Sequence, residues 1–208
     1  MNDINNVLVL APHTDDGEFG CGGTIAKFIE DNGLVKYVAF SIAEDSVSPE
    51  YPKDILYTEA HQSAKVLGVK DLTIHRFQVR RFLEKRQQIL EIMVKLNESM
   101  HPDIVFAPSR DDTHQDHQVI AAEAFRAFKK TTILGYEIPW NNLTFHTNAF
   151  SKLEECHLNR KVDALKCYIS QMGRSYVTGE FVVSLAKTRG AQIGEKYAET
   201  FEVVRLRL

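Results

Sequence analysis

The amino-acid sequence predicts an α/β fold with a mainly parallel β-sheet, and three observations lead to that prediction. Short apolar segments rich in β-branched residues alternate with segments of helical periodicity, as βαβ units require. The chain has 208 residues, the size of one domain. No internal repeat, low-complexity tract or linker divides it. We therefore expect a single Rossmann-like domain over residues 1–208, with helices on both faces of the sheet.

The first strand and the first helix flank a glycine-rich segment. Residues 7–11 are an apolar, β-branched run typical of a buried strand. The glycines between residues 17 and 23 indicate a tight turn. Residues 24–32 have helical spacing, and Gly33 is suited to end that helix.

The middle of the chain continues this alternation. Apolar runs predict a second strand over residues 35–42 and a third over residues 72–77. The segment between them, residues 56–67, has small and apolar residues on one helical face and ends at Gly68.

Two further strand and helix pairs follow. Residues 82–100 form an amphipathic pattern that predicts a long helix. Residues 103–107 are continuously apolar, as buried parallel strands are. Residues 117–128 predict a helix, and residues 131–136 predict a fifth strand.

The last third is expected to hold a helix over residues 152–170 and a terminal strand over residues 200–208. In parallel sheets, ligands bind beyond the carboxyl ends of the strands. The loops that follow residues 10, 40, 106 and 135 should therefore converge on one crevice.

The composition limits the classes of partner and compartment. The 25 Lys and Arg against 28 Asp and Glu give a net charge of −3, which argues against a nucleic-acid partner. Three cysteines do not make a disulfide framework. The sequence has neither a signal-peptide pattern nor an apolar run of spanning length, so we expect a cytoplasmic protein without a membrane anchor.

The loop after the first strand carries His13, Asp15 and Asp16. Adjacent carboxylates repel each other unless a cation or a donor compensates them. His13 and Asp16 are three residues apart and could share one divalent ion, which would leave Asp15 beside it as a general base. A solvated acidic turn is the alternative interpretation.

The glycines in this region do not make a dinucleotide-binding fingerprint. Starting from Gly20 and Gly22, the third glycine position holds Ile25. A nicotinamide cofactor is therefore not expected.

The loop after the fourth strand carries a second cluster of histidines and aspartates. His117 can supply the third ligand of a set with His13 and Asp16, and three ligands with an open position are typical of catalytic zinc. His114 would then polarise the reacting carbonyl. The alternative is that this segment is only a polar helix start capped by aspartates.

Two more aspartates of this cluster have an expected supporting role. Asp112 or Asp116 could orient one of the imidazoles, because ligating histidines often donate their second ring N–H to a carboxylate.

These motifs resemble the zinc-dependent de-N-acetylases of the PIG-L/LmbE type. That family carries His-Pro-Asp-Asp after its first strand, a glycine-rich segment, and a later His-Pro-Asp-His. The corresponding segments are residues 12–16 (Pro-His-Thr-Asp-Asp), 20–24 (Gly-Cys-Gly-Gly-Thr) and 114–117 (His-Gln-Asp-His). Weaker similarities in residues 59–68, 161–171 and 189–201 extend the resemblance over nearly the whole chain.

The resemblance implies a role for each motif residue. By resemblance, His13, Asp16 and His117 bind the metal, Asp15 activates a water, and His114 stabilises the tetrahedral intermediate. It also implies a Rossmann-like fold, a zinc cofactor and hydrolysis of an N-acetyl group from an amino sugar or amino-sugar conjugate. Fe²⁺ and other divalent ions also suit such ligands.

The chain departs from the family pattern in places that bear on the substrate. Thr14 and Gln115 replace prolines, and Leu56 occupies a position where the family often has a substrate-facing arginine. We consider three other arginines as suppliers of that contact, with a solvated surface charge as the alternative for each: Arg80, Arg81 and Arg110.

Two other functions use the same residues. His13-x-Asp15 with a distant histidine also matches the iron(II) facial triad, although those oxygenases have a different, all-β architecture. A catalytically inactive homologue that only binds a metal or a sugar is the second alternative. The expected partner is a small N-acetylated sugar, and homo-oligomers are common in the family.

Overall fold

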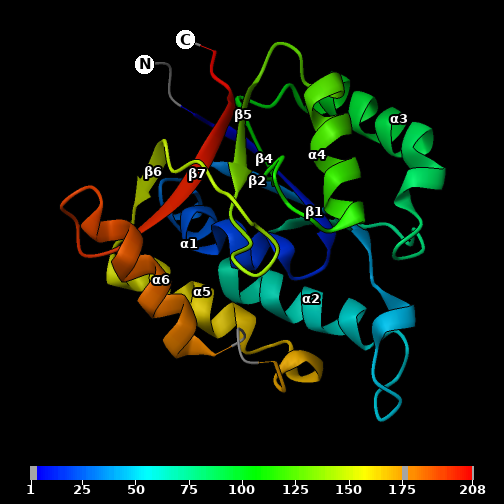
Figure 1. Ribbon diagram of the computed structural model, residues 1–208, viewed down its shortest axis with the longest axis horizontal. Coiled ribbons are helices and arrows are strands. Elements are labelled where there is room, and N and C mark those ends of the chain that lie inside the picture. The colour runs from blue at the N-terminus through cyan, green and yellow to red at the C-terminus, as the bar shows by residue number, and fades with distance from the viewer. Residues whose placement is uncertain (1–3, 175–177, 208) are drawn as a thin grey trace.

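The computed structural model describes residues 4–174 and 178–207, and its helices surround a central sheet (Figure 1). The strands found in these residues are β1 (Asn6–His13), β2 (Leu34–Ser41), β3 (Asp71–Ile74), β4 (Ile104–Pro108), β5 (Thr132–Tyr136), β6 (Ala149–Lys152) and β7 (Ala198–Arg205). The helices are α1 (Asp16–Glu30), α2 (Ile55–Leu67), α3 (Phe82–Met100), α4 (Gln115–Ala127), α5 (Glu155–Leu165) and α6 (Gly179–Ala191). Short 3₁₀ turns lie at η1 (Glu44–Ser46) and η2 (Ile169–Gln171).

The strands form one sheet in the order β3-β2-β1-β4-β5-β7-β6. Neighbours from β3 to β5 are parallel, whereas β7 runs antiparallel to both β5 and β6. The order reverses between β1 and β4, and such a switch point opens a crevice beyond the carboxyl ends of the two strands. The predicted α/β class with a mainly parallel sheet is confirmed.

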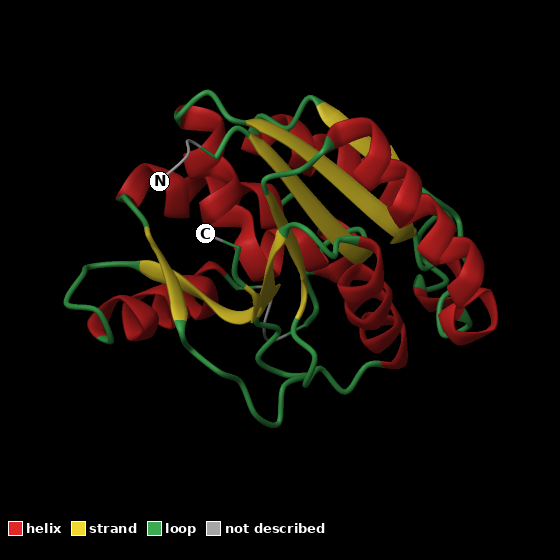
Figure 2. Cartoon of the chain, turned by 90° about the horizontal axis from the view of Figure 1, so that it is seen from above, coloured by secondary structure: helices red, strands yellow, loops and turns green. Residues whose placement is uncertain are grey.

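Helices cover both faces of the sheet, as Figure 2 shows from above. Because side chains alternate along a strand, Val7, Val9 and Ala11 of β1 pack with α1, α2, α5 and α6 on one face. Leu8 and Leu10 pack with α3 and α4 on the other. In the described residues, none of the helices combines the length and the hydropathy needed to cross a membrane.

The first helix differs from its expected form. α1 begins at Asp16, so the prediction of a glycine turn before residue 24 is wrong, and the glycines lie inside the helix. Gly20 is needed there because a Cβ at this position would lie 2.3 Å from the ring of Tyr136. The helix kinks at Cys21 (φ −146°, ψ 22°), and Asn32 rather than Gly33 takes the left-handed conformation after its end.

A buried ion pair forms hydrogen bonds with the backbone groups that this kink leaves without partners in the helix. The Lys161 ammonium donates to the Phe19 carbonyl at 2.6 Å and pairs with Glu199 at 2.6 Å. The Glu199 carboxylate accepts the backbone N–H groups of Gly23 at 3.0 Å and Thr24 at 2.7 Å. Residues from α5 and β7 thus cap the two halves of α1.

The last third also differs from expectation. The helix expected over residues 152–170 is wrong at both ends, because Ala149–Lys152 pairs with β7 as strand β6 and α5 ends at Leu165. Glu154 and His157 form a capping box that starts α5. The helix α6 was not expected, and the terminal strand begins at Ala198 instead of residue 200.

Candidate metal centre

The two predicted loops meet at the switch point of the sheet. His13 is the last residue of β1, and Asp16 opens α1 directly after it. The loop after β4 leads into α4, which carries His117 in its first turn. Since β1 and β4 are adjacent and parallel, both loops leave the sheet at the same edge.

One carboxylate oxygen lies between two imidazoles. Asp16 Oδ2 is 3.1 Å from His13 Nδ1 and 3.2 Å from His117 Nε2, and it also accepts the backbone N–H of His13 at 2.8 Å. One ligand atom from each of the three side chains lies within 4.8 Å of the others, so the group could hold a metal ion.

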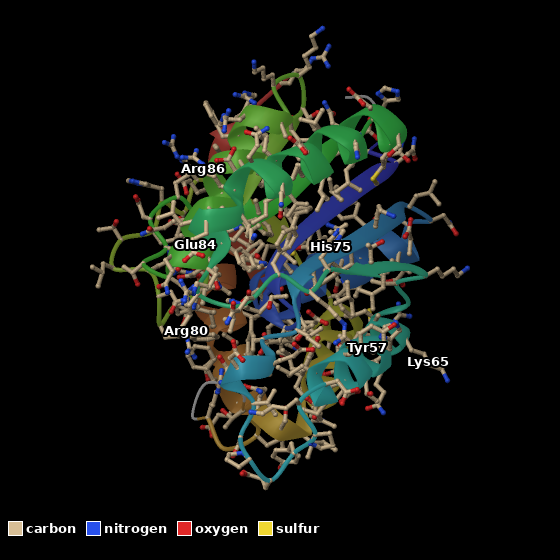
Figure 3. All side chains as sticks on the ribbon, turned by 90° about the vertical axis from the view of Figure 1, so that its right-hand side faces the viewer. Tyr57, Lys65, His75, Arg80, Glu84 and Arg86 are labelled. Carbon is tan, nitrogen blue, oxygen red and sulfur yellow. The ribbon has the colours of Figure 1, made fainter. Side chains whose placement is uncertain are left out.

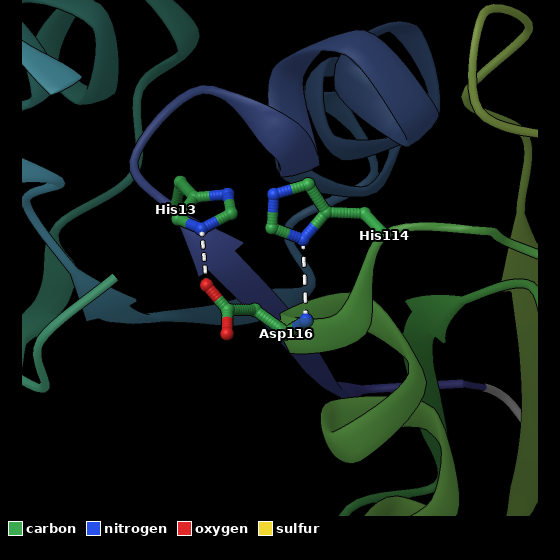
Figure 4. A group of neighbouring side chains, drawn as sticks. All are labelled: His13, His114 and Asp116. Atoms are coloured by element: carbon green, nitrogen blue, oxygen red, sulfur yellow. Dashed lines mark hydrogen bonds and ion pairs between the residues drawn. The ribbon is translucent and has the colours of Figure 1, made fainter. Parts of the chain in front are cut away.

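The second ring nitrogen of each histidine contacts its own carboxylate. His13 Nε2 is 3.1 Å from Asp116 Oδ2, a contact visible in Figure 4. His117 Nδ1 is 2.7 Å from Asp112 Oδ2. Asp112 and Asp116 are both buried. Carboxylates in this position fix the tautomer and the orientation of metal-ligating histidines.

A second, overlapping group consists of His13, His114 and Asp116. Here the Nδ1 of His114 accepts the backbone N–H of Asp116 at 3.2 Å (Figure 4). A backbone amide can only donate, so the proton of a neutral His114 must sit on Nε2. His114 therefore offers an N–H donor rather than a free metal-ligating nitrogen, and this group fits a metal less well than His13, Asp16 and His117.

A third group lies at the far end of α1. His157 Nε2 is 2.5 Å from Glu30, and the Cys156 thiol is 3.9 Å from the same oxygen. The Nδ1 of His157 accepts the backbone N–H of Glu154, so its Nε2 carries the proton. This group is better explained as a hydrogen bond between α1 and α5 than as a metal site.

The charges of His13, Asp16 and His117 shift one another's pKa. Burial alone would lower the pKa of His13, but Asp16 and Asp116 outweigh it and raise the pKa to about 9. Burial would also lower the pKa of His117, but Asp16 and Asp112 raise it to about 10. Although burial opposes ionisation of Asp16, the two imidazoles hold its pKa far below the usual range.

Asp15 and His114 have different environments. Burial, with the Asp16 charge, raises the pKa of Asp15 to about 6. Burial, with the neighbouring His13 and His117, lowers the pKa of His114, so this imidazole is neutral near pH 7. Both side chains line a cleft of about 530 Å³ that also contains His13, Asp16 and His117.

A buried network holds the backbone of the first loop. The hydroxyls of Tyr37 and Tyr168 donate to the Thr14 carbonyl at 2.9 and 2.7 Å, and both contact Glu18. Ser63 also donates to Glu18, at 2.6 Å. These contacts fix the peptide between His13 and Asp15 where the family resemblance leads one to expect a proline.

The three arginines considered from the sequence occupy different places. Arg80 lines the cleft. Arg81 is exposed and pairs with Glu84, and Arg110 packs over the Phe125 ring. The structure therefore brings only Arg80 of the three to the site.

Other residues of the cleft were not expected from the sequence as site residues. Arg174 and Gln171 reach it from η2 and the turn that follows, and Asp45 and Ser46 from η1. No local motif marks them, because only the packing of loops far apart in the chain brings them together.

The sequence contains three aromatic residues that could stack on a sugar ring, with core packing as the alternative for each: Trp140, Phe145 and Tyr176. Trp140 lines the cleft with its ring 5.0 Å from that of Phe19, whereas Phe145 is not among the lining residues. Tyr176 lies outside the described residues.

Sequence comparison finds a known family over the segment that carries both loops. A family model described as PIG-L, GlcNAc-PI de-N-acetylase, matches residues 8–128. The chain is 25% identical over 172 residues to an uncharacterised deacetylase, YaiS, of Escherichia coli K12, covering 79% of this chain and 91% of that protein. It is 24% identical over 196 residues to a probable N-acetyl-α-D-glucosaminyl L-malate deacetylase 2 of Bacillus anthracis, covering 82% and 83%.

Solved structures share the fold. An N,N′-diacetylchitobiose deacetylase from Pyrococcus horikoshii superposes with a TM-score of 0.78 at 24% identity, covering 97% of this chain and 84% of the other. GalB, a 4-carboxy-2-hydroxymuconate hydratase from Pseudomonas putida KT2440, gives 0.79 at 19% identity, covering 99% and 98%. Since a deacetylase and a hydratase match equally well, the fold alone does not decide the reaction.

Proposed function

The chain belongs to the PIG-L family of de-N-acetylases, and from this premise we propose that it is a zinc-dependent hydrolase that removes the N-acetyl group of an amino sugar or amino-sugar conjugate. The observation that carries the proposal is the arrangement of His13, Asp16 and His117. Each histidine directs one ring nitrogen to Asp16 and the other to a buried carboxylate of its own.

The donor set fits a catalytic divalent ion. Two imidazoles and one carboxylate are a common set of three protein ligands for zinc, which leaves a coordination position for water or substrate. The chemistry also suits Fe²⁺, so zinc is the first ion to test. An ion held there would polarise the amide carbonyl and lower the pKa of a bound water.

Asp15 and His114 supply the proton transfer and the charge stabilisation in this proposal. Asp15 takes a proton from the attacking water, and its raised pKa of about 6 keeps it mostly ionised at neutral pH yet basic enough to accept a proton. His114 donates its Nε2–H to the oxyanion that forms from the acetyl carbonyl. The backbone contact at Nδ1 keeps that proton on Nε2.

The names of relatives support a sugar substrate. The B. anthracis relative is named for an N-acetylglucosaminyl conjugate and the P. horikoshii structure for an N-acetylated disaccharide. The half-exposed Trp140 offers this cleft an apolar ring face of the kind on which a sugar can stack. A cytoplasmic location and a homo-oligomeric state remain predictions.

The test measures acetate release from a panel of N-acetylated amino sugars by the zinc-loaded protein. We expect release from at least one glucosaminide, and we expect His117→Ala to lose both activity and bound metal in elemental analysis. Normal metal content in His117→Ala would contradict the ligand assignment.

The panel also separates the competing functions. Acetate release without oxygen or an oxo-acid would exclude an oxygenase. Bound metal without release from any member would favour a binding protein. Addition of water to an unsaturated acid, with no acetate released, would favour a hydratase.

A further inference from the structure

The charged guanidinium of Arg80, at the cleft, contacts the uncharged side chain of Ser46. Its guanidinium donates from Nη2 to the Ser46 hydroxyl at 2.8 Å. Within residues 4–174 and 178–207, no carboxylate lies within 4.0 Å of it. The neighbouring Arg76, Arg81 and Arg86 each pair with a glutamate, so Arg80 differs from the arginines around it.

The backbone holds Arg80 in a conformation that side chains disfavour. Its φ is +67°, in the left-handed region. The backbone N–H of Arg80 donates to Asp116 Oδ2 at 2.7 Å, and that of Phe82 lies 3.4 Å from the other oxygen. Such strain persists where surrounding contacts impose it, and it is common at ligand-binding positions.

The contact with Asp116 fixes Arg80 relative to the candidate metal centre. Asp116 Oδ2 also lies 3.1 Å from His13 Nε2, so one buried oxygen contacts both the imidazole and the peptide of Arg80. Figure 3 shows Arg80 just before α3, whose Glu84 and Arg86 lie further along the helix. The peptide of Arg80 is therefore held next to the candidate metal centre, and its guanidinium lies against Ser46 in the lining of the same cleft.

We propose that Arg80 binds a carboxylate on the substrate, at a position away from the N-acetyl group. This inference rests on the proposed function and names the substrate class as N-acetylated amino-sugar conjugates with an acidic aglycone. A guanidinium presents parallel N–H donors that match a carboxylate. One guanidinium neutralises the single charge of a carboxylate but only part of the charge of a phosphate dianion.

The test compares two matched substrates, the N-acetylglucosaminides of glycolic acid and of glycolamide, which differ in one negative charge. The kcat/KM ratio for acetate release is measured for the wild type, Arg80→Gln and Arg81→Gln. Calorimetric binding of each compound to the same three proteins gives the preference independently of turnover. Arg81 is the matched control, because it is adjacent and already paired with Glu84.

We expect the wild type to prefer the acid by about tenfold, the size of a charge-assisted hydrogen bond in a partly exposed site. The ratio should fall to near one in Arg80→Gln, persist in Arg81→Gln and decrease with added salt. No preference in the wild type, or one that persists in Arg80→Gln, would overturn the inference. A preference for a matched glycoside phosphate over the acid would overturn the carboxylate assignment.

The two proposals fail in different ways. Turnover of the neutral glycolamide compound without any preference refutes the role of Arg80 and leaves the deacetylase intact. An Arg80-dependent preference in binding, without acetate release from either compound or from any member of the panel, refutes the deacetylase and supports the subsite.

Discussion

At the scale of single residues, the imidazoles of His13 and His117 are fixed by contacts at both ring nitrogens. Asp16 contacts one nitrogen of each, while Asp116 and Asp112 contact the others. A ligand held in this way needs no rotation when an ion binds, which lowers the entropic cost of binding. In the proposed mechanism, Asp15 and His114 remain available for proton transfer and for stabilising the oxyanion.

Replacing the proposed base should separate catalysis from metal binding. We expect Asp15→Asn to retain its metal by elemental analysis but to lose about 10²–10⁴-fold in kcat, the usual effect of removing a general base. Full activity in this variant would mean that Asp15 does not accept the proton.

The supporting carboxylates should tune metal affinity. We expect Asp112→Asn and Asp116→Asn each to weaken zinc binding by about 10–100-fold in a competition titration, because the imidazoles lose their charged acceptors. Asp111→Asn is the control, since the carboxylate of Asp111 is partly exposed and contacts Thr144 and His146 instead. Equal effects in all three variants would argue against the specific role.

At the scale of secondary-structure elements, the approach of α1 to the sheet positions the site. The helix begins at the candidate metal ligand Asp16, and its glycines allow the backbone to pack directly on neighbouring rings. Lys161 and Glu199 then compensate the kink at Cys21. The first turn of α1 is thus held by parts of the chain that lie more than 130 residues away.

Because α1 packs closely on the sheet, enlarging one of its glycines should lower the free energy of unfolding. In Gly20→Ala the new Cβ would lie 2.3 Å from the buried Tyr136 ring, so we expect a loss of about 1–3 kcal/mol in the free energy of unfolding by urea. Gly173→Ala is the matched control, because no atom lies within 4 Å of a Cβ there. Similar midpoints for both variants would show that the helix shifts at little cost.

At the scale of the whole molecule, the cleft gathers charged groups from many parts of the chain. Its lining includes acidic, basic and imidazole side chains from β1, α1, η1, α4 and the loop after η2. In the metal-free protein, Asp16 forms ion pairs with His13 and His117. A metal ion would replace the imidazole protons as the positive partner of Asp16.

This exchange predicts opposite pH dependences for stability and for metal binding. His13 and His117 have folded-state pKa values of about 9 and 10, above the ordinary 6.5. Their contribution to folding is therefore fully present below about pH 6.5 and is lost as the pH rises through 9 to 10. We expect the metal-free protein to lose stability over that window in urea unfolding.

Zinc affinity should rise over the same window, because the ion must displace those protons. We expect about a tenfold gain per pH unit for each proton released, measured by competition titration below the pH at which zinc hydroxide forms. A pH-independent affinity between 6.5 and 8.5 would show that the imidazoles are already neutral without metal.

The sequence predicted best those elements whose own residues carry a strong periodic pattern. The helix Phe82–Met100 matches its expected bounds, because its periodic apolar face, with Ile89 and Met93 buried, makes the pattern strong. The helix α6 was missed because its buried residues form only a narrow stripe of Val182, Ala186 and Gly190. Strand β6 has four residues and exists through its pairing with β7.

The sequence by itself determined that His13, Asp15 and Asp16 follow one buried strand and that His114 and His117 follow another. Strand alternation was enough to bring them to one edge, since the carboxyl ends of parallel strands share it. Only the tertiary structure decided which nitrogen of each histidine faces which carboxylate, and that Arg80 rather than Arg81 or Arg110 reaches the cleft. The physical reason is that side-chain direction depends on contacts between segments distant in the chain, which no local pattern encodes.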